Sequence, residues 1–92
     1  MNKTELIAIM AEKAEVTKKV AEEVLNAFID TVAESLGQRG EKVVLTGFGT
    51  FEVRDRAARS GRDPRSGKTI HIPAQKTPAF RAGKGLKDAV KR

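Results

Sequence analysis

The segment 18–37 carries more apolar surface than one helix in a small protein can bury by itself. Thr17 is a suitable N-cap, and Gly37 and Gly40 are suitable end signals, so the pattern predicts a helix over residues 18–37. At ~100° per residue its apolar side chains spread over about 200° of the circumference, whereas a helix on one core needs a stripe of only ~100°. These side chains are Val20, Val24, Leu25, Ala27, Phe28, Ile29, Val32 and Leu36.

The rest of the chain offers too little to cover this excess. A chain of 92 residues is one domain, and a fold of this size buries only ~60–65% of its extended-chain surface. The chain has no cysteine, so neither a disulfide nor a thiolate metal site stabilises it. We therefore infer a symmetric homodimer with helices packed at its centre. A monomer with a broad core helix is the alternative.

A shorter helix and a hairpin flank this segment. Asn2 and Glu5 resemble a capping box, and the apolar spacing that follows predicts a helix over residues 3–14, with a break at Glu15. Residues 42–46 and 50–54 alternate as strands around the turn 47–49, with Phe51 on one face and Glu52 on the other. We place Phe48, Phe51 and Phe80 in the core, with an aromatic base-stacking platform as the alternative.

Charge is divided unevenly along the chain. Residues 1–45 hold 6 basic and 8 acidic side chains, a net charge of −2, whereas residues 46–92 hold 12 and 4, a net charge of +8. A concentrated positive field indicates a polyanionic partner, either nucleic acid or an acidic membrane surface. No apolar run is long enough to span a membrane. The first residues do not resemble a signal peptide, so we expect a cytoplasmic protein.

Residues 55–78 carry much of this charge on a stretch with little apolar surface. Ile70 and Ile72 are its only large aliphatic residues, and Asp63-Pro64-Arg65-Ser66-Gly67 is a turn sequence. The pattern predicts a two-stranded ribbon with Pro64 near its tip, and Pro73 suggests a bulge or edge in the returning strand. A disordered loop is the alternative. The basic residues in and beside this stretch are Arg54, Arg56, Arg59, Arg62, Arg65, Lys68 and Lys76.

These residue types favour a minor groove of DNA over a merely solvated surface. Arginine forms bidentate phosphate contacts and suits narrow, electronegative grooves. An apolar ring such as that of Pro64, at the end of an extended element, can enter between base pairs and kink the duplex.

The chemistry of an enzyme is not evident. The nearest phosphate-loop match, Gly61 to Thr69, has its first glycine one residue too early and lies in a hairpin. His71 is the single histidine and has no apparent partner. We expect no catalytic residues, metal site, cofactor or small-molecule substrate.

The chain ends in a predicted short helix over residues 83–90. Leu86 and Val90 are spaced i, i+4, and we expect both to dock the helix. Lys84, Lys87 and Lys91 are expected to face solvent or an anion.

Several segments in this order resemble the HU family of bacterial histone-like DNA-binding proteins. They are Met1-Asn2-Lys3-Thr4-Glu5-Leu6, Gly47-Phe48-Gly49-Thr50-Phe51, Arg56-Ala57-Ala58-Arg59, Gly61-Arg62-Asp63-Pro64-Arg65-Ser66-Gly67-Lys68 and the stretch from Pro78 to Val90. The resemblance covers essentially the whole chain.

The resemblance implies an α+β fold in an intertwined homodimer. Two N-terminal helices per chain form its base, a small antiparallel sheet extends into a β-ribbon arm, and a short helix ends the chain. We expect one domain over residues 1–92, with a dimerisation body of 1–54 and 79–92 and a DNA-binding arm of 55–78. Dimer contacts are expected from Val24, Phe28, Val32, Leu36, Phe48, Phe51 and Phe80.

The resemblance also implies non-sequence-specific binding, bending and condensation of duplex DNA in the nucleoid, with a preference for bent or nicked DNA. Carried over by position, Pro64 intercalates, Gly47 allows close approach to DNA, Arg56, Arg59 and Arg62 line the arm, and Lys3, Lys84 and Lys87 contact phosphates. The other basic candidates are Arg54, Arg65, Lys68, Lys76 and Arg81. The family usually has Asn where this chain has Asp63, and an acid there should weaken tip contacts with phosphate, which Arg65 can offset.

Three other functions are open at this point. One is a site-specific DNA bender of the integration host factor type, which shares the fold. Another is a ribosome- or RNA-associated protein. The third, a membrane-surface peptide, is disfavoured because the basic segment has no apolar helical face.

Overall fold

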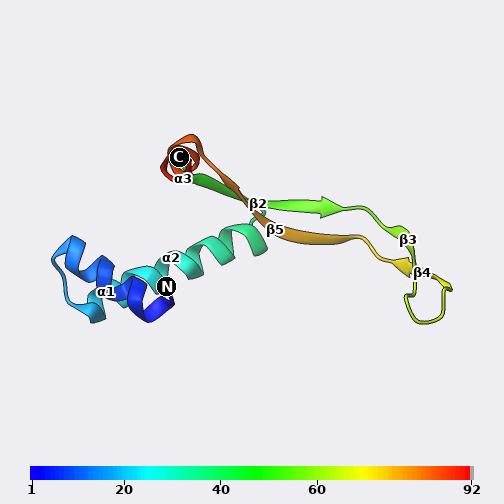
Figure 1. Ribbon diagram of the computed structural model, residues 1–92, viewed down its shortest axis with the longest axis horizontal. Coiled ribbons are helices and arrows are strands. Elements are labelled where there is room, and N and C mark those ends of the chain that lie inside the picture. The colour runs from blue at the N-terminus through cyan, green and yellow to red at the C-terminus, as the bar shows by residue number, and fades with distance from the viewer. Residues whose placement is uncertain (92) are drawn as a thin grey trace.

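The computed structural model shows an elongated molecule in which a ribbon projects from a helical body (Figure 1). Its extents are 57 × 34 × 28 Å and its radius of gyration is 18.6 Å, against about 12 Å for a compact domain of this length. Residues 1–91, which are those that the structure describes, form three helices and five strands. The elements are α1 (Lys3–Ala14), α2 (Lys18–Gly37), β1 (Val43–Leu45), β2 (Gly49–Arg56), β3 (Arg59–Arg62), β4 (Thr69–Ile72), β5 (Gln75–Ala82) and α3 (Lys84–Val90).

Local capping signals set the limits of the two long helices. The side chain of Asn2 accepts a hydrogen bond from the Glu5 amide at 2.9 Å, and that of Thr17 accepts one from the Val20 amide at 3.2 Å. α1 ends where Glu15 adopts the left-handed conformation, with φ 55°. Both helices predicted from the sequence are confirmed, with the predicted bounds.

The body has a very small core within one chain. α1 packs on α2, and the buried hydrophobic residues among those described are Ile7, Ala11 and Ala21, with Met10 and Leu25 packed beside them. Most of the apolar surface of α2 is left open. The exposed fraction is 58% for Val24, 46% for Ile29 and 38% for Phe28.

The body sheet is antiparallel in the order β1-β2-β5, and its aromatic face turns toward α2. Phe51 pairs with Phe80 across the strands, their ring centroids are 4.8 Å apart, and Phe28 of α2 meets Phe51 edge-on at 6.1 Å. Phe48 contacts Phe80 at 5.5 Å. Phe48 remains 47% exposed and Phe80 40%, so the expectation that both lie in the core does not hold within one chain.

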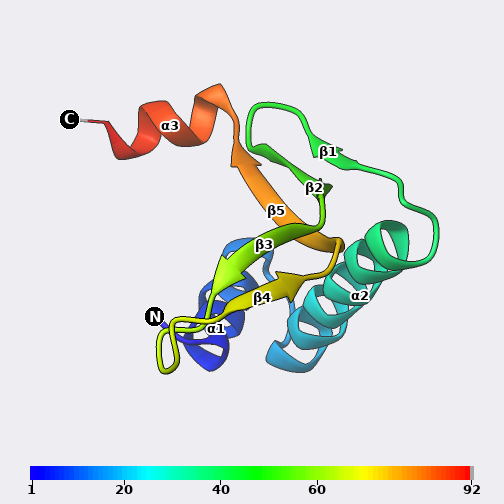
Figure 2. The ribbon, with the colours of Figure 1, turned by 90° about the vertical axis from the view of Figure 1, so that its right-hand side faces the viewer.

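The ribbon is continuous with the body sheet, and its ladder is interrupted once. β2 and β5 pair as far as Arg56 and Gln75, and β3 and β4 resume pairing at Arg59 and Ile72. The interruption contains Pro73, which has no amide hydrogen to donate. This agrees with the predicted irregularity there. Figure 2 shows β3 and β4 as a separate outer pair that continues from β2 and β5 and lies in front of α1 in this view.

Main-chain contacts attach α3 to the turn between β1 and β2. The Gly83 amide donates to the Phe48 carbonyl at 2.7 Å, and the Leu86 amide donates to the Gly47 carbonyl at 3.3 Å. A Cβ on Gly85 would lie 2.7 Å from the Gly47 oxygen, so only glycine permits this approach. The prediction that Val90 docks the helix is wrong for the single chain, since Val90 is 73% exposed.

Candidate nucleic-acid interface

One face of the inner part of the ribbon, where β2 pairs with β5, carries three of the predicted arginines. Side chains alternate between the faces of a strand, and the β2–β5 register places Phe51 opposite Phe80. The other face therefore carries Arg54, Arg56 and Arg81, all exposed. This face points away from α2 and is polar, as the alternation in the sequence predicted.

Glu52 lies on this same basic face. Its side chain is 15% exposed, and its Oε1 atom lies 3.6 Å from Nε of Arg81, which is 62% exposed. That oxygen is buried and has no hydrogen-bond partner among the described residues. Sequence reasoning placed Glu52 on the solvent face and missed this burial, because the alternation gives a face but not the depth at which a side chain lies.

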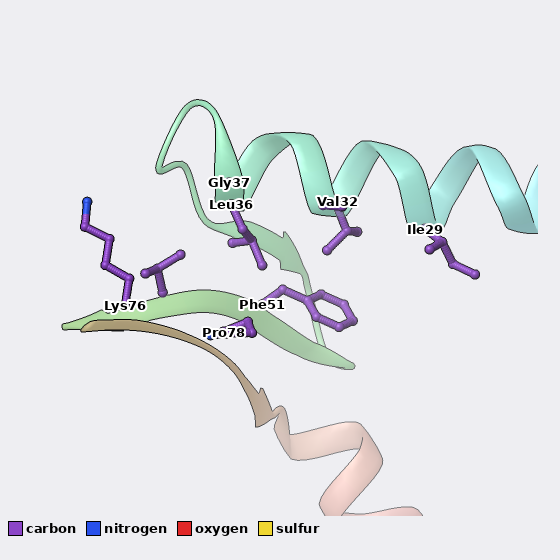
Figure 3. A pocket seen from close by; sticks show the side chains of 9 residues that line it. Ile29, Val32, Leu36, Gly37, Phe51, Lys76 and Pro78 are labelled. Carbon is purple, nitrogen blue, oxygen red and sulfur yellow. The ribbon is translucent and has the colours of Figure 1, made fainter. Parts of the chain in front are cut away.

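Lys76 is separated from these arginines. The register places it directly across from Asp55, on the same face as Phe51 and Pro78. There it lines an apolar hollow between α2 and the body sheet, which is shown in Figure 3. The ribbon twists, so the direction in which each face points changes along its length. Lys76 and Arg54 nevertheless lie on opposite faces of the same strand pair.

The outer part of the ribbon, where β3 pairs with β4, carries arginine on both faces. Arg59 shares its face with Ile70 and Ile72, and Arg62 shares the opposite face with His71. Gly61 makes room for the isoleucines, since a Cβ there would lie 2.9 Å from Cδ1 of Ile72. A groove that encloses this ribbon would therefore meet positive charge on either side.

The tip holds Pro64 at the far end of the ribbon. Pro64, Arg65, Ser66 and Lys68 are exposed in the loop between β3 and β4, whereas Asp63 is partly buried. The Asp63 carboxylate accepts hydrogen bonds from the Arg65 amide at 2.9 Å and from Ser66 Oγ at 3.2 Å. These bonds were not predicted from the sequence, where Asp63 was expected only to start a turn and to carry a charge, although an Asp in a turn commonly accepts a bond from the backbone two residues on.

The remaining candidates lie on the body. Lys84 and Lys87 are exposed on α3. Lys3 stands at the start of α1, where its Nζ donates to Asn26 Oδ1 of α2 at 2.7 Å. Gly47 has φ +85°, and this conformation by itself accounts for a glycine there, since a Cβ at the position would meet nothing within 4 Å.

An apolar hollow of about 520 Å³ separates α2 from the body sheet. Figure 3 shows Ile29, Val32 and Leu36 of α2 pointing toward it, with Phe51 and Pro78 on the sheet side. The hollow has no polar side chain other than Lys76 in its lining. It therefore lacks the convergent polar groups of a small-molecule site and is suited to apolar side chains.

The described part of the chain lacks two other kinds of feature. Residues 1–91 contain no group of three or more His, Cys, Asp or Glu side chains that could hold a metal ion. Within the same residues, no helix is both long and apolar enough to cross a membrane.

Comparisons with known proteins agree with the arrangement of the ribbon and body. A family model described as "Bacterial DNA-binding protein" matches residues 1–91. DNA-binding protein HU-1 of Halalkalibacterium halodurans is 62% identical over 91 residues, which cover 99% of this chain and 100% of the relative. DNA-binding protein HU of Clostridium pasteurianum is 58% identical over 92 residues, covering 100% of both.

Solved structures show the same fold. An Anabaena HU–DNA cocrystal structure superposes with a TM-score of 0.91 at 49% identity and covers 99% of this chain and 98% of that one. An HU variant from Thermotoga maritima gives a TM-score of 0.73 at 38% identity, covering 99% and 100%. The relatives are named as DNA-binding proteins and not as enzymes. The chain therefore belongs to the bacterial DNA-binding protein family, that of the histone-like protein HU.

Proposed function

We propose that this protein is a non-sequence-specific architectural protein that binds, bends and condenses duplex DNA. The observation that carries the proposal is the ribbon itself, which extends from the body, bears arginine on both faces and ends in an exposed proline. The names of the relatives and of the HU–DNA neighbour support it. A location on the nucleoid follows from this binding.

The active form in this proposal is a homodimer. The accessible surface of the single chain is 7801 Å², against about 5,200 Å² for a folded monomer of this mass. The extended ribbon accounts for part of the excess, and the open apolar side chains of the body account for more. A second copy that covers α2 and the aromatic face of the sheet would bury the predicted contacts, which are Val24, Phe28, Val32, Leu36, Phe48, Phe51 and Phe80.

Two such chains would present two arms to one duplex. In this proposal residues 1–54 and 79–92 form the body, and residues 55–78 form the arm that enters the minor groove. Phosphate contacts would come from the arginines of the arm, from Arg65 and Lys68 at its tip, and from Lys3, Arg81, Lys84 and Lys87 on or beside the body. Lys76, which shares a face with the apolar hollow, is the weakest of the candidates.

In this proposal the free energy gained by neutralising DNA phosphates drives the deformation of the duplex. Opening a base step costs a few kcal/mol, and bending a site by 40–90° costs roughly 1–6 kcal/mol. Counterion release from contacted phosphates offsets both costs. Bent or nicked DNA should bind better because part of the deformation is already present. The site-specific alternative is not favoured, because the relatives are named HU.

The test is ring closure of a duplex shorter than the persistence length of ~150 bp, with gel-shift measurements on linear, nicked and RNA duplexes. Wild-type protein should promote closure and prefer nicked DNA. Pro64→Ala should lose closure more than affinity, because it removes the wedge and keeps the charge. Arg59→Ala should weaken binding uniformly across sequences. Saturated DNA that stays straight would refute the proposal, and stronger binding to RNA duplexes would redirect it to RNA.

A further inference from the structure

The tip loop is the one part of the arm that is ordered by its own side chains. Among residues 62–71, Asp63 alone is not exposed. Its main chain closes the loop, because its amide donates to the Lys68 carbonyl at 2.9 Å and its carbonyl accepts from the Gly67 amide at 2.8 Å. A six-residue loop is thereby joined across its base.

The side chain of Asp63 closes the loop a second time. One carboxylate oxygen accepts from the Arg65 amide at 2.9 Å and the other from Ser66 Oγ at 3.2 Å. Ser66 Oγ in turn accepts from the Lys68 amide at 3.3 Å. These bonds join Asp63, before Pro64, to residues that follow it, so the pyrrolidine ring is held at the end of the loop.

We propose that Asp63 and Ser66 form a bracket that positions Pro64 for insertion into DNA, which makes Asp63 a positioning residue and not merely an unfavourable charge. The inference rests on the proposed DNA-bending function. The proline ring must keep its position at the tip while the base pairs resist unstacking. A loop that is already ordered also loses less conformational entropy when it binds DNA. The bracket supplies that order in a region with no apolar core.

Asp63 can act as an unfavourable charge or as part of the bracket, and the two roles predict opposite effects of replacing it. If only charge mattered, any neutral residue would strengthen binding by removing repulsion from phosphate. If the bracket matters, the residue must keep an acceptor for the Arg65 amide. Asn keeps that acceptor and can also donate to Ser66 Oγ, which has lone pairs to spare, whereas Ala offers neither.

The experiment compares Asp63→Ala and Asp63→Asn in ring closure and in affinity for linear duplex. We expect Asp63→Ala to reduce ring closure roughly tenfold or more, the scale set by hydrogen bonds to a charged group, while its affinity for linear DNA stays equal or rises. Asp63→Asn should retain ring closure. Ser66→Ala should show a partial loss, and Ser66→Thr, which keeps the hydroxyl, should behave as wild type.

Asp55→Ala is the matched control for charge. Asp55 is an exposed acid on the same arm, and among residues 1–91 its carboxylate has no hydrogen bond or ion pair. It should raise affinity slightly and leave ring closure unchanged. A readout without DNA is the ¹⁵N relaxation of the Arg65 and Gly67 amides, which should become more mobile in Asp63→Ala than in Asp63→Asn.

The outcomes separate this inference from the proposed function. Wild-type protein that fails to promote ring closure contradicts the bending function itself. Wild-type closure that Asp63→Ala leaves intact overturns the bracket alone. Equal loss in Asp63→Asn and Asp63→Ala also overturns it, because the negative charge and not the acceptor geometry would then be responsible.

Discussion

The body and the arm are both incomplete in the single chain, and they lack different things. The body has apolar side chains without enough apolar surface to cover them, as Val24 and Ile29 show by their exposure of 58% and 46%. The arm has almost no apolar surface and depends on its backbone ladder and the hydrogen bonds of its tip. In the proposed function a second copy would complete the body by burying its apolar side chains, and DNA would complete the arm by neutralising its charge.

The body and the arm should therefore respond to different solution conditions. Apolar association is governed by buried area and is insensitive to moderate salt. Binding of a basic arm to DNA releases counterions and is steeply salt-dependent.

Salt should produce the largest change. If ~6–10 phosphates are contacted, affinity for duplex DNA should fall ~10³–10⁵-fold between 50 and 200 mM salt. Sedimentation over the same range should show an unchanged mass for the free protein, because its interface is apolar. A dimer that dissociates as salt rises would show that charge, and not apolar burial, holds the body together.

A charge on the apolar face of α2 should be nearly as damaging. Val32→Glu places a carboxylate in the apolar hollow of Figure 3 and should cost about 3 kcal/mol or more, because Lys76 is the single cation in the lining and even a pair with it would lose its hydration. Thermal unfolding and sedimentation should report loss of the dimer and of most stability. Lys19→Glu, on the exposed side of the same helix, is the control and should leave both measurements nearly unchanged.

Removing the acid from the basic face should have a smaller effect. Glu52→Gln frees Arg81 from its 3.6 Å partner and removes a charge that repels phosphate. Affinity for DNA should rise two- to fivefold, on the scale of ~0.4–1 kcal/mol for a partly exposed pair. The gain should disappear in an Arg81→Ala background, and Glu41→Gln in the loop before β1 should not reproduce it. A loss of affinity would show that Glu52 supports Arg81 instead of competing for it.

The smallest effect should come from the end of α1. Glu15 has φ 55°, a conformation that disfavours residues with a Cβ. Glu15→Gly should therefore stabilise the protein by roughly 0.5 kcal/mol, after the greater flexibility of unfolded glycine is offset. Denaturant unfolding measures the gain, and DNA affinity should not change. Glu12→Gly, inside the same helix, should destabilise by ~1 kcal/mol.

The parts of the fold that were predictable are those set by local signals. Asn2 and Thr17 cap their helices through their own side chains, so the helix limits follow from residues that are close in sequence. Period-two alternation also predicted the two faces of β2 correctly. Phe51 lies on the same face of the sheet as Phe80, its partner on β5. The tip position of Pro64 followed from turn chemistry alone.

The parts that were missed depend on distance in space. Burial of Glu52 arises from neighbours on β5, and the separation of Lys76 from Arg54 depends on a strand register that composition cannot supply. The exposure of Phe48 and Phe80 was also missed, because the sequence indicates which residues avoid water but not which molecule covers them. The bond from the Arg65 amide to Asp63 was open to prediction from the local turn signal, but the bond from Ser66 Oγ depends on the rotamers of both side chains.

The attachment of α3 has a consequence for how the chain can vary. This helix is joined to the body through the carbonyls of Gly47 and Phe48, and a Cβ on Gly83 or Gly85 would lie only 3.0 or 2.7 Å from the Gly47 oxygen. The outward positions of the helix, including Lys87 and Val90, contribute little to holding it. That outer surface can therefore change without detaching the helix, so a cation such as Lys87 is constrained by what the helix binds and not by the fold.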